Sequence, residues 1–199
     1  MVQRTRLYAT RLFVAILLAL LFVGGSEWEE KCPVVSTILF SIGCFLTGIA
    51  SLGRLWCSVY IAGHKIKNLI VQGPYSICRN PLYFFSMLGG LGVGLASETL
   101  TIPAILLIAF AFYYPFVIRY EEQNLRNQFG QSYDDYVRRT PQFWPKWSLL
   151  NEPEEYTFSP KVFKKHLFSA LWFIWMIGIL ELIEELHELQ LVPEYFYFY

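Results

Sequence analysis

Two polar clusters stand at the two ends of a hydrophobic hairpin, and this arrangement constrains the fold more than any other feature of the chain. The first cluster begins at Gly73 and reads Gly-Pro-Tyr-Ser-Ile-Cys-Arg-Asn-Pro-Leu-Tyr, and the second begins at Arg119 and reads Arg-Tyr-Glu-Glu-Gln-Asn-Leu-Arg. Between them lie two apolar stretches, 82–97 and 100–118, joined by Ser-Glu-Thr-Leu. A link this short joins only adjacent antiparallel helices. We therefore expect the two polar clusters to meet at one end of the hairpin.

The composition indicates that the hairpin lies in a membrane. The chain has 199 residues, of which 55% are hydrophobic and only 16% charged, and these values are unusual for a soluble domain of this size. A bilayer core about 30 Å thick requires about 17–25 mostly apolar residues per helix. Five stretches are candidates, namely 12–25, 34–60, 82–97, 100–118 and 167–183. We therefore expect an all-α, polytopic membrane protein with about five transmembrane helices in a single membrane domain, 1–199. Because some of the stretches are short, four spans is the alternative.

The placement of charge indicates the orientation in the membrane. If the N-terminus is cytoplasmic, one side holds most of the 16 basic residues, and the other holds Lys31 with many of the acids. The cytoplasmic set is Arg4, Arg6, Arg11, Lys65, Lys67, Arg79, Arg119, Arg126, Arg138, Arg139, Lys146, Lys161, Lys164 and Lys165, and the opposing acids are Glu27, Glu29, Glu30, Glu98, Glu184, Glu185, Glu188 and Glu194. This bias follows the positive-inside rule, so we expect the N-terminus and both polar clusters to be cytoplasmic. Residues 1–25 also fit a cleaved signal peptide, which would leave the rest of this topology unchanged.

Three local features add detail to the expected helices. Pro115 lies inside the fourth stretch and predicts a kink. Residues 124–137 carry apolar residues at helical spacing and predict a helix along the cytoplasmic interface, broken at Gly130. Arg54 lies inside the second stretch, and either extends to the cytoplasmic surface or faces a cavity.

The chemistry of the two clusters implies a ligand with charges of both signs. The hairpin places Arg79 and the helix that follows Pro81 near Glu121 and Glu122. A cation and free helix N–H groups can hold a carboxylate or phosphate oxygen, while the two glutamates can hold an ammonium or sulfonium. Ionisable groups at membrane depth usually serve a function, because the membrane penalises them.

The two motifs, in this order and separated by two spans, resemble those of the integral-membrane methyltransferases of the isoprenylcysteine carboxyl methyltransferase and phospholipid methyltransferase group. The resemblance rests on Gly-Pro-Tyr-x3-Arg-Asn-Pro-x-Tyr and Glu-Glu-x2-Leu-x3-Phe-Gly-x2-Tyr-x2-Tyr, and 70–147 is the expected motif core. It implies that S-adenosylmethionine is the cofactor and that the acceptor is lipid-like or prenylated, at the cytoplasmic face among membrane lipids. We expect neither a nucleic acid nor a metal as partner.

The resemblance also implies roles for particular residues. The expected cofactor pocket is lined by Tyr75, Arg79, Asn80, Pro81, Leu82 and Tyr83, while Glu121 and Glu122 bind the cationic end of the cofactor. Arg79 and Glu121 are the expected catalytic pair. A Gly-x-Gly in the third span, either Gly90 with Gly92 or Gly92 with Gly94, would admit the adenosyl group or a neighbouring helix. Many members carry His where this chain has Asn80, and because Asn does not take up a proton near neutral pH, a general-base role there is in doubt.

Simpler interpretations stand beside these. Glu122 and Arg126 have the i, i+4 spacing of a surface ion pair, Arg79 could be one more cytoplasmic charge, Tyr83 an interfacial aromatic, and the glycines helix-packing positions. An NADPH-dependent sterol or enoyl reductase and a non-catalytic membrane scaffold are the alternative functions. No Gly-x-Gly-x-x-Gly motif is present, which excludes the soluble methyltransferase fold.

Overall fold

The computed structural model describes residues 2–63 and 68–199, apart from the side chains of 2–11, 13 and 30. The described chain is mostly helical, as expected, with two short strands and one 3-10 turn. The helices are α1 (Val2–Val23), α2 (Glu27–Lys31), α3 (Pro33–Ile61), α4 (Pro74–Ile77), α5 (Pro81–Leu95), α6 (Thr101–Phe129), α7 (Gln131–Arg139) and α8 (Pro160–Glu188). The 3-10 turn is η1 (Trp147–Leu149), and the strands are β1 (Gly24–Ser26) and β2 (Phe196–Phe198).

Helices form at all five predicted places, but they differ in length. Helices α3, α6 and α8 have 29 residues each and are apolar enough to cross a membrane. At 1.5 Å per residue each is about 43 Å long, close to the thickness of a bilayer with its headgroups. Helix α5 and the apolar part of α1, Val14–Val23, are shorter. Three spans therefore follow from length and composition, and the count of five stays a prediction.

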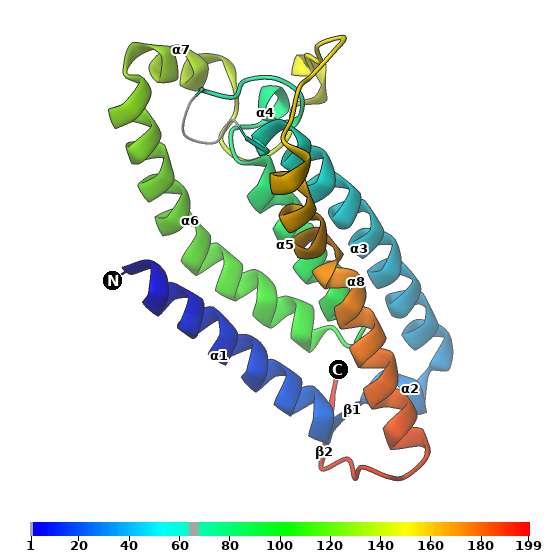
Figure 1. The fold of residues 1–199 in the computed structure, drawn as a ribbon. Coiled ribbons are helices and arrows are strands. Elements are labelled where there is room, and N and C mark those ends of the chain that lie inside the picture. Colours follow the sequence, from blue (N-terminus) through cyan, green and yellow to red (C-terminus); the bar gives the residue numbers. More distant parts are fainter. Residues whose placement is uncertain (1, 64–67) are drawn as a thin grey trace.

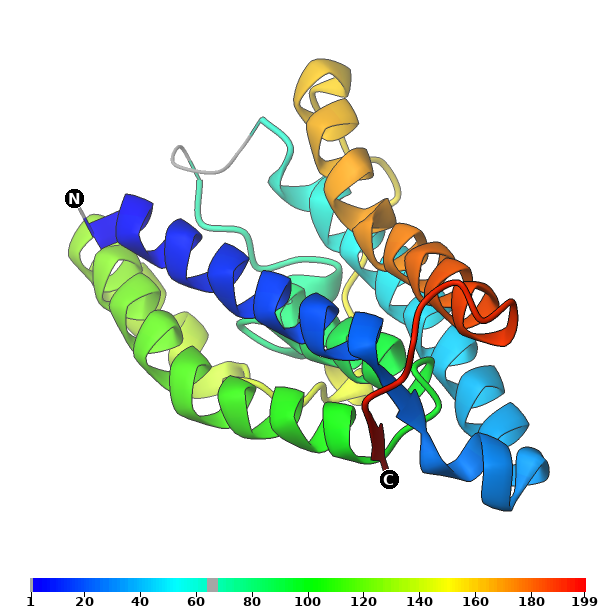
Figure 2. The ribbon, with the colours of Figure 1, turned by 90° about the horizontal axis from the view of Figure 1, so that it is seen from below.

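The long helices form two groups. Helices α3, α5 and α8 pack together, and α6 runs beside α1 and approaches the first group most closely at its own N-terminal end (Figures 1 and 2). Figure 1 shows that α6 changes direction part-way along its length and draws away from α5, and Pro115 lies within this helix. At the end where the two groups meet, Leu17 and Leu21 of α1 are buried with residues of α6 and α8.

The second half of α6 differs from the expected interfacial helix. Residues 124–129 continue α6 because nothing in the sequence breaks the helix between Ile118 and Phe129. The break at Gly130 is confirmed: its φ of 53° is a conformation that glycine adopts without strain, and α7 starts directly after it.

Close contact between α3 and α5 is made possible by small residues. A Cβ on Gly92 would lie 2.5 Å from Thr47 Oγ1 and 2.8 Å from the Gly43 carbonyl oxygen. Gly43 in turn faces the backbone of Gly92 and Ala96. Small residues at such a crossing let two helix backbones approach in a membrane, so Gly92 serves helix packing.

The end of the bundle away from α4 and α7 is closed by the C-terminal segment. Strand β2 pairs with β1 in parallel, with Gly24 opposite Phe196 and Ser26 opposite Phe198. The carbonyl oxygen of Tyr199 accepts hydrogen bonds from the N–H groups of Leu100 and Thr101, both at 2.7 Å, at the start of α6. The Tyr-Phe-Tyr-Phe-Tyr segment at 195–199 therefore forms a strand and a helix cap, and the strand pair is a departure from the expected all-α fold.

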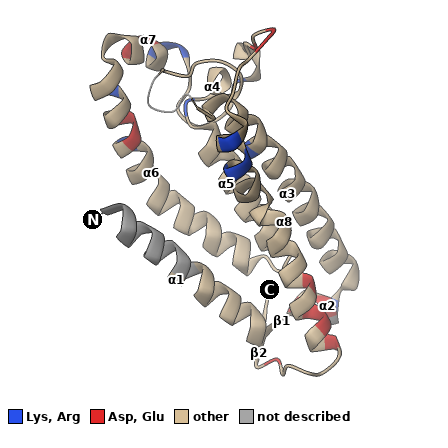
Figure 3. Cartoon of the chain, in the orientation of Figure 1, with Lys and Arg blue, Asp and Glu red and all other residues tan. Residues whose placement is uncertain are grey.

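Charge separates along the bundle. Figure 3 shows most basic residues at the end that carries α4 and α7, and a group of acidic residues at the end that carries α2. This matches the separation expected from the sequence, and the cytoplasmic position of the basic end stays a prediction. The side chains of Arg4, Arg6, Arg11 and Glu30, and residues Lys65 and Lys67, lie outside the described residues.

Glu98 is buried at the acidic end, in the link between α5 and α6. Its side chain accepts a hydrogen bond from Ser36, its backbone carbonyl accepts one from Ser26 Oγ at 2.8 Å, and only 8% of the residue is exposed. Burial, followed by the charges of Glu29 and Glu181, raises the pKa of Glu98. The folded state therefore holds the proton of Glu98 more tightly than the unfolded state does.

We expect Gly92→Ala to lower the thermal midpoint of the detergent-purified protein by several degrees, because the added methyl group meets backbone atoms and overpacking costs about 1–3 kcal/mol. Gly90→Ala is the matched control, since a Cβ on Gly90 meets nothing within 4 Å. Thermal unfolding followed by circular dichroism measures both. Equal midpoints for the two variants would contradict the packing role of Gly92.

The thermal midpoint should also depend on pH through Glu98. A raised pKa means that the stabilising contribution is complete below the ordinary glutamate pKa of about 4.3 and is lost as the pH rises through the folded value. The midpoint should therefore fall as the buffer moves from acidic to neutral, and Glu98→Gln should reduce this fall. The exposed Glu154→Gln serves as control and should leave the pH dependence unchanged.

Candidate functional site

The loop that carries the first motif is shaped by Gly73. Its φ of 57° lies in the left-handed region, and a Cβ there would collide with the ring of Tyr60. Pro74 then starts α4, where a missing N–H is tolerated. The loop is held from outside by the connector after α7, because the Gly73 N–H donates to the Asn151 carbonyl at 2.8 Å. The Gly-Pro pair thus sets the direction in which the rest of the motif leaves α4.

Arg79 and Glu122 form the central ion pair of the site. Arg79 Nη1 lies 3.3 Å from Glu122 Oε1, and the two side chains are only 11% and 16% exposed. Asn80 Nδ2 donates to the same Glu122 oxygen at 3.2 Å and to the Gln142 carbonyl at 3.0 Å. Gln142 Nε2 donates to the other Glu122 oxygen at 3.0 Å. Glu122 therefore ties the start of α5 to the end of α6, as the hairpin predicted.

The segment that follows α7 and α7 itself complete this framework. The Arg79 N–H donates to the Pro141 carbonyl at 2.8 Å, and the Lys146 N–H donates to the Ile77 carbonyl at 2.9 Å. The Tyr136 hydroxyl donates to the Tyr75 carbonyl at 2.6 Å. The backbone of the first motif is thus fixed on two sides by residues that lie far along the chain.

A cavity of about 460 Å³ opens between the start of α5 and the C-terminal half of α6. Its walls combine aromatic and aliphatic side chains with a few polar ones. The lining residues are Ile61, Asn68, Leu69, Ile70, Tyr75, Arg79, Asn80, Leu82, Tyr83, Tyr120, Glu121, Asn124, Leu125, Gln128, Phe129 and Tyr136. This volume and this mixture of groups are typical of small-molecule sites.

Most of the residues implied by the motifs meet at this cavity. Those that line it are Tyr75, Arg79, Asn80, Leu82, Tyr83 and Glu121. Pro81 is fully buried at the first position of α5 and shapes the wall without facing the cavity. Gly90 and Gly92 do not line the cavity, and Gly92 packs against α3.

Glu121 and Glu122 have different surroundings although they are neighbours in the sequence. Glu122 is engaged by Arg79, Asn80 and Gln142, and does not line the cavity. Arg126 pairs with Asp134 at 2.8 Å, so the expected surface pair with Glu122 does not form. Glu121 lines the cavity, and within the described part of the chain its carboxylate has no hydrogen-bond or ion-pair partner. One glutamate is therefore structural, and the other is available to a ligand.

The sequence reasoning missed several lining residues. Asn124 and Gln128 follow Glu121 by three and seven residues, so helical periodicity would have placed them on the same face of α6. Tyr136 belongs to the quoted Tyr-x2-Tyr motif, but its contact with α4 depends on the chain reversal at Gly130. Asn68, Leu69 and Ile70 come from an irregular segment that carries no signal.

Burial controls the protonation of the phenols near the cavity. It raises the pKa of Tyr75 and Tyr136 well above the ordinary value, and that of Tyr133 is also raised, with Glu122 adding to the effect. These hydroxyls are therefore neutral donors at physiological pH. Arg79 Nε is buried without a hydrogen-bond partner among the described residues. Among the described lining residues the site thus offers a cation, an available carboxylate and neutral donors, but no histidine.

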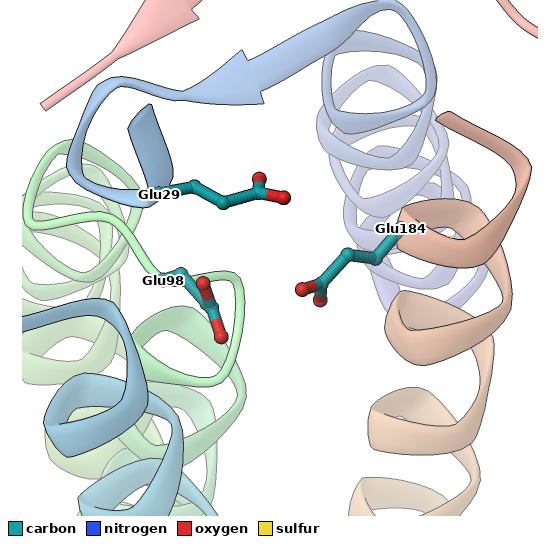
Figure 4. A group of neighbouring side chains, drawn as sticks. All are labelled: Glu29, Glu98 and Glu184. Carbon is teal, nitrogen blue, oxygen red and sulfur yellow. The ribbon is translucent and has the colours of Figure 1, made fainter. Parts of the chain in front are cut away.

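A second group of polar side chains lies at the opposite end of the bundle. Glu29 from α2, Glu98 from the α5–α6 link and Glu184 from α8 point toward one another (Figure 4), with one oxygen from each within 4.8 Å of the others. The adjoining cavity, about 40 Å³, also reaches His187 and Glu194. Carboxylate oxygens are ligands that hard divalent cations accept. The sequence placed these acids on one side of the membrane but did not bring the three together.

The comparisons with known proteins agree with the motif pair. The sequence pattern described as phospholipid methyltransferase matches residues 33–132. A nickel-cobalt-cadmium resistance protein, NccN, of Alcaligenes xylosoxydans xylosoxydans is 36% identical over 192 residues, covering 96% of this chain and 89% of the relative. A cobalt-zinc-cadmium resistance protein, CzcN, of Cupriavidus metallidurans is 37% identical over 185 residues, covering 93% of this chain and 84% of the relative. No solved structure matches.

The matched pattern spans α3 to the start of α7, and so contains both polar clusters and the helices that join them. The two relatives extend the similarity over nearly the whole chain. The chain therefore belongs to the phospholipid methyltransferase family.

Proposed function

We propose that this protein is an integral-membrane methyltransferase that uses S-adenosylmethionine and methylates a lipid-like acceptor at a carboxylate or an amine. The observation that carries the proposal is that Arg79 and Glu121, one from each motif, line the same cavity. Membership of the family supports the reaction class. The proposed catalytic pair remains Arg79 and Glu121, whereas Glu122 takes the role of a positioning residue.

The residues around the cavity fit this cofactor. Its amino-acid part carries a carboxylate and an ammonium, and it supplies an electrophilic methyl group on a sulfonium when bound. Arg79 offers a cation with a buried Nε that lacks a partner, and Glu121 offers an available carboxylate. The volume of about 460 Å³ lies within the usual range for sites of this kind.

The surrounding contacts preorganise these groups. Glu122, held by Asn80 and Gln142, fixes the guanidinium of Arg79 in one place before a ligand binds. Tyr75, together with Tyr83 and Tyr120, surrounds the cavity with aromatic surface that excludes water and can face a sulfonium. Because methyl transfer depends mainly on alignment and exclusion of water, a fixed framework supplies much of what the reaction needs.

The apolar part of the cavity suits an amphipathic acceptor. Leu69 and Ile70 line one side, and Leu125 and Phe129 of α6 line another. The cavity is lined by the start of α5 and the C-terminal half of α6, which draws away from α5 toward this end (Figure 1), and we infer that an acceptor enters there from the bilayer. We place the polar head of the acceptor at the polar end of the cavity and its hydrocarbon part against α6.

The two alternative functions have less support. NADPH carries several phosphate charges and needs several cations, but among the described lining residues Arg79 is the only basic one, and Glu121 would repel a polyanion. A non-catalytic scaffold would not need an available carboxylate in a buried cavity, where an unpaired charge lowers stability.

The proposal predicts that Glu121→Gln weakens binding of S-adenosylhomocysteine at least about tenfold, because it removes one charge-assisted contact of about 1.5–3 kcal/mol. Isothermal titration calorimetry on the detergent-purified protein measures this. The thermal midpoint should not fall, since Glu121 has no partner to lose among the described residues.

Glu155→Gln, an exposed carboxylate on the connector, is the control and should bind as the unmodified protein does. Glu122→Gln should lower the thermal midpoint as well as the affinity, because Arg79 and Asn80 lose their shared acceptor. NADPH binding with no S-adenosylhomocysteine binding would replace the proposal by a reductase, and binding of neither would favour a scaffold.

The names of the relatives suggest a physiological setting. They are named for resistance to nickel, cobalt, zinc and cadmium. Methylation of a lipid headgroup carboxylate removes a negative charge, and the charge of a membrane surface controls how strongly it attracts cations. We propose that methyl transfer at the cavity contributes to growth in the presence of these metals.

In cells that lack this gene, the unmodified gene should restore growth on cadmium or cobalt, and Glu121→Gln should not. Glu29→Gln, which alters the acidic group at the other end of the bundle, should restore growth fully. The measurement is the metal concentration that halves growth. The reverse pattern, with Glu29 required and Glu121 dispensable, would move the role from methyl transfer to metal binding.

A further inference from the structure

Arg54 is the one charged residue of α3, and it lies inside the bundle of α3, α5 and α8. Its Nη1 donates to Ser86 Oγ on α5, and its Nη2 donates to Ser169 Oγ on α8 at 2.9 Å. The guanidinium lies 5.5 Å from the ring centre of Phe173. Arg54 is not among the residues that line the large cavity. The sequence left open whether it reaches the surface or a cavity, and the structure places it in a seam between three helices.

The charge of Arg54 is not neutralised within the described chain. No carboxylate of the described residues forms an ion pair with it. Among these residues, the hydrogen-bond partners of its guanidinium are the hydroxyls of Ser86 and Ser169. Its Nε is buried without a hydrogen-bond partner. Serine hydroxyls orient a guanidinium but carry no opposite charge, and an uncompensated cation among apolar helices is strongly unfavourable. This arrangement calls for an anion from outside the chain.

Arg54 has an open side and further positive charge next to it. Ser169 is exposed, so the bonded edge of the guanidinium reaches the outer face of α8. Lys161 and Lys165 precede Ser169 by eight and four residues and therefore lie on the same face of α8. Both lysines are exposed, and Figure 3 shows that the start of α8, next to α5, is basic. The two lysines of α8 and Arg54 of α3 thus place positive charge along one face of α8, from its start to Ser169.

The depth of Arg54 matches the headgroup boundary of a bilayer. Arg54 lies seven residues before the end of α3, or about 10 Å along the helix axis, and α3 is about as long as a bilayer with its headgroups is thick. Apolar side chains on the outer faces of the same helices stay exposed below it, among them Leu52 on α3 at 70% and Trp175 on α8 at 63%. An anion bound at this position therefore lies near the boundary between headgroups and hydrocarbon, above surface suited to acyl chains.

We propose that Arg54, with Ser169 and Lys165, binds the phosphate of an anionic phospholipid in the seam between α3 and α8. The negative headgroup neutralises Arg54, Lys165 adds a second charge, and the acyl chains run along the exposed apolar surface of the two helices. This lipid lies on the side of α5 that faces α3 and α8. It is therefore separate from the acceptor proposed for the cavity, which lies between α5 and α6.

The test is thermal unfolding of the detergent-purified full chain with added phosphatidylglycerol, phosphatidylcholine or inorganic phosphate. Phosphatidylglycerol at about a hundredfold excess over its dissociation constant should raise the midpoint by about 5 °C or more, and the other two should have little effect. Lys165→Gln should reduce the shift by at least half. Lys164→Gln is the matched control, because it removes the same charge from the adjacent residue on another face of α8.

Arg54→Gln should abolish the shift while leaving the lipid-free midpoint equal or higher, because it removes a buried charge and keeps a donor for Ser86. Should this variant fail to fold, Lys165→Gln and Lys164→Gln decide the matter alone. An equal lipid shift in both lysine variants, or in Arg54→Gln, would overturn the proposal. An equal shift with inorganic phosphate would overturn the lipid assignment. No cofactor is present in this assay, so its result is independent of the proposed methyltransferase activity.

Discussion

The Glu122 carboxylate is the contact on which the candidate site depends. Helix α6 leaves α5 soon after the link that joins them, so backbone packing alone would let their far ends separate. Glu122 prevents this by accepting from Arg79 and Asn80 at the start of α5 and from Gln142 beyond α7. Because the pair is largely buried, its geometry is held more strictly than that of a surface ion pair. The cavity is the space that remains when the two helices diverge yet stay tied at their ends.

The opposite end of α5 shows why divergence on one side is possible. Gly43, Thr47 and Gly92 let α3 and α5 approach closely, so α5 belongs to a rigid wall. Helix α6 contacts this wall mainly at its own start, where the Tyr199 carbonyl caps it. The pocket therefore lies between a rigid wall, formed by α3 and α5, and α6, which is anchored at both ends. Its formation does not require α5 to move.

The sequence predicted the parts of this structure that depend on local rules. A link as short as Ser97 to Leu100 forces a hairpin, so the meeting of Arg79 with the glutamate pair followed directly. The division of labour between Glu121 and Glu122 could not be predicted, because it depends on Gln142, which reaches Glu122 only after the reversal at Gly130. The pairing of β1 with β2 was also out of reach, since it joins Gly24 to Phe196 across almost the whole chain.

The same limit applies to the glycines. Gly90 and Gly92 are indistinguishable in the sequence, but one faces open space and the other meets α3. A Gly-x-Gly pattern reports that small residues are present and not which helix face they occupy. Only the crossing point of α3 and α5, a tertiary property, assigns Gly92 to packing and leaves both glycines outside the cavity.

The inventory of proton-transfer groups at the cavity limits the acceptor that the proposed reaction can use. Asn80 takes up no proton near neutral pH, and its amide is committed to Glu122 and Gln142. Burial raises the pKa values of Tyr75 and Tyr136, so these phenols keep their protons near neutral pH. They therefore cannot accept a proton from the acceptor. Glu121, in the proposed function, is paired with the cationic end of the cofactor. Among the described lining residues a protonated amine would find no free base, whereas a carboxylate brings its own lone pair, and within the proposed function this favours carboxyl methylation.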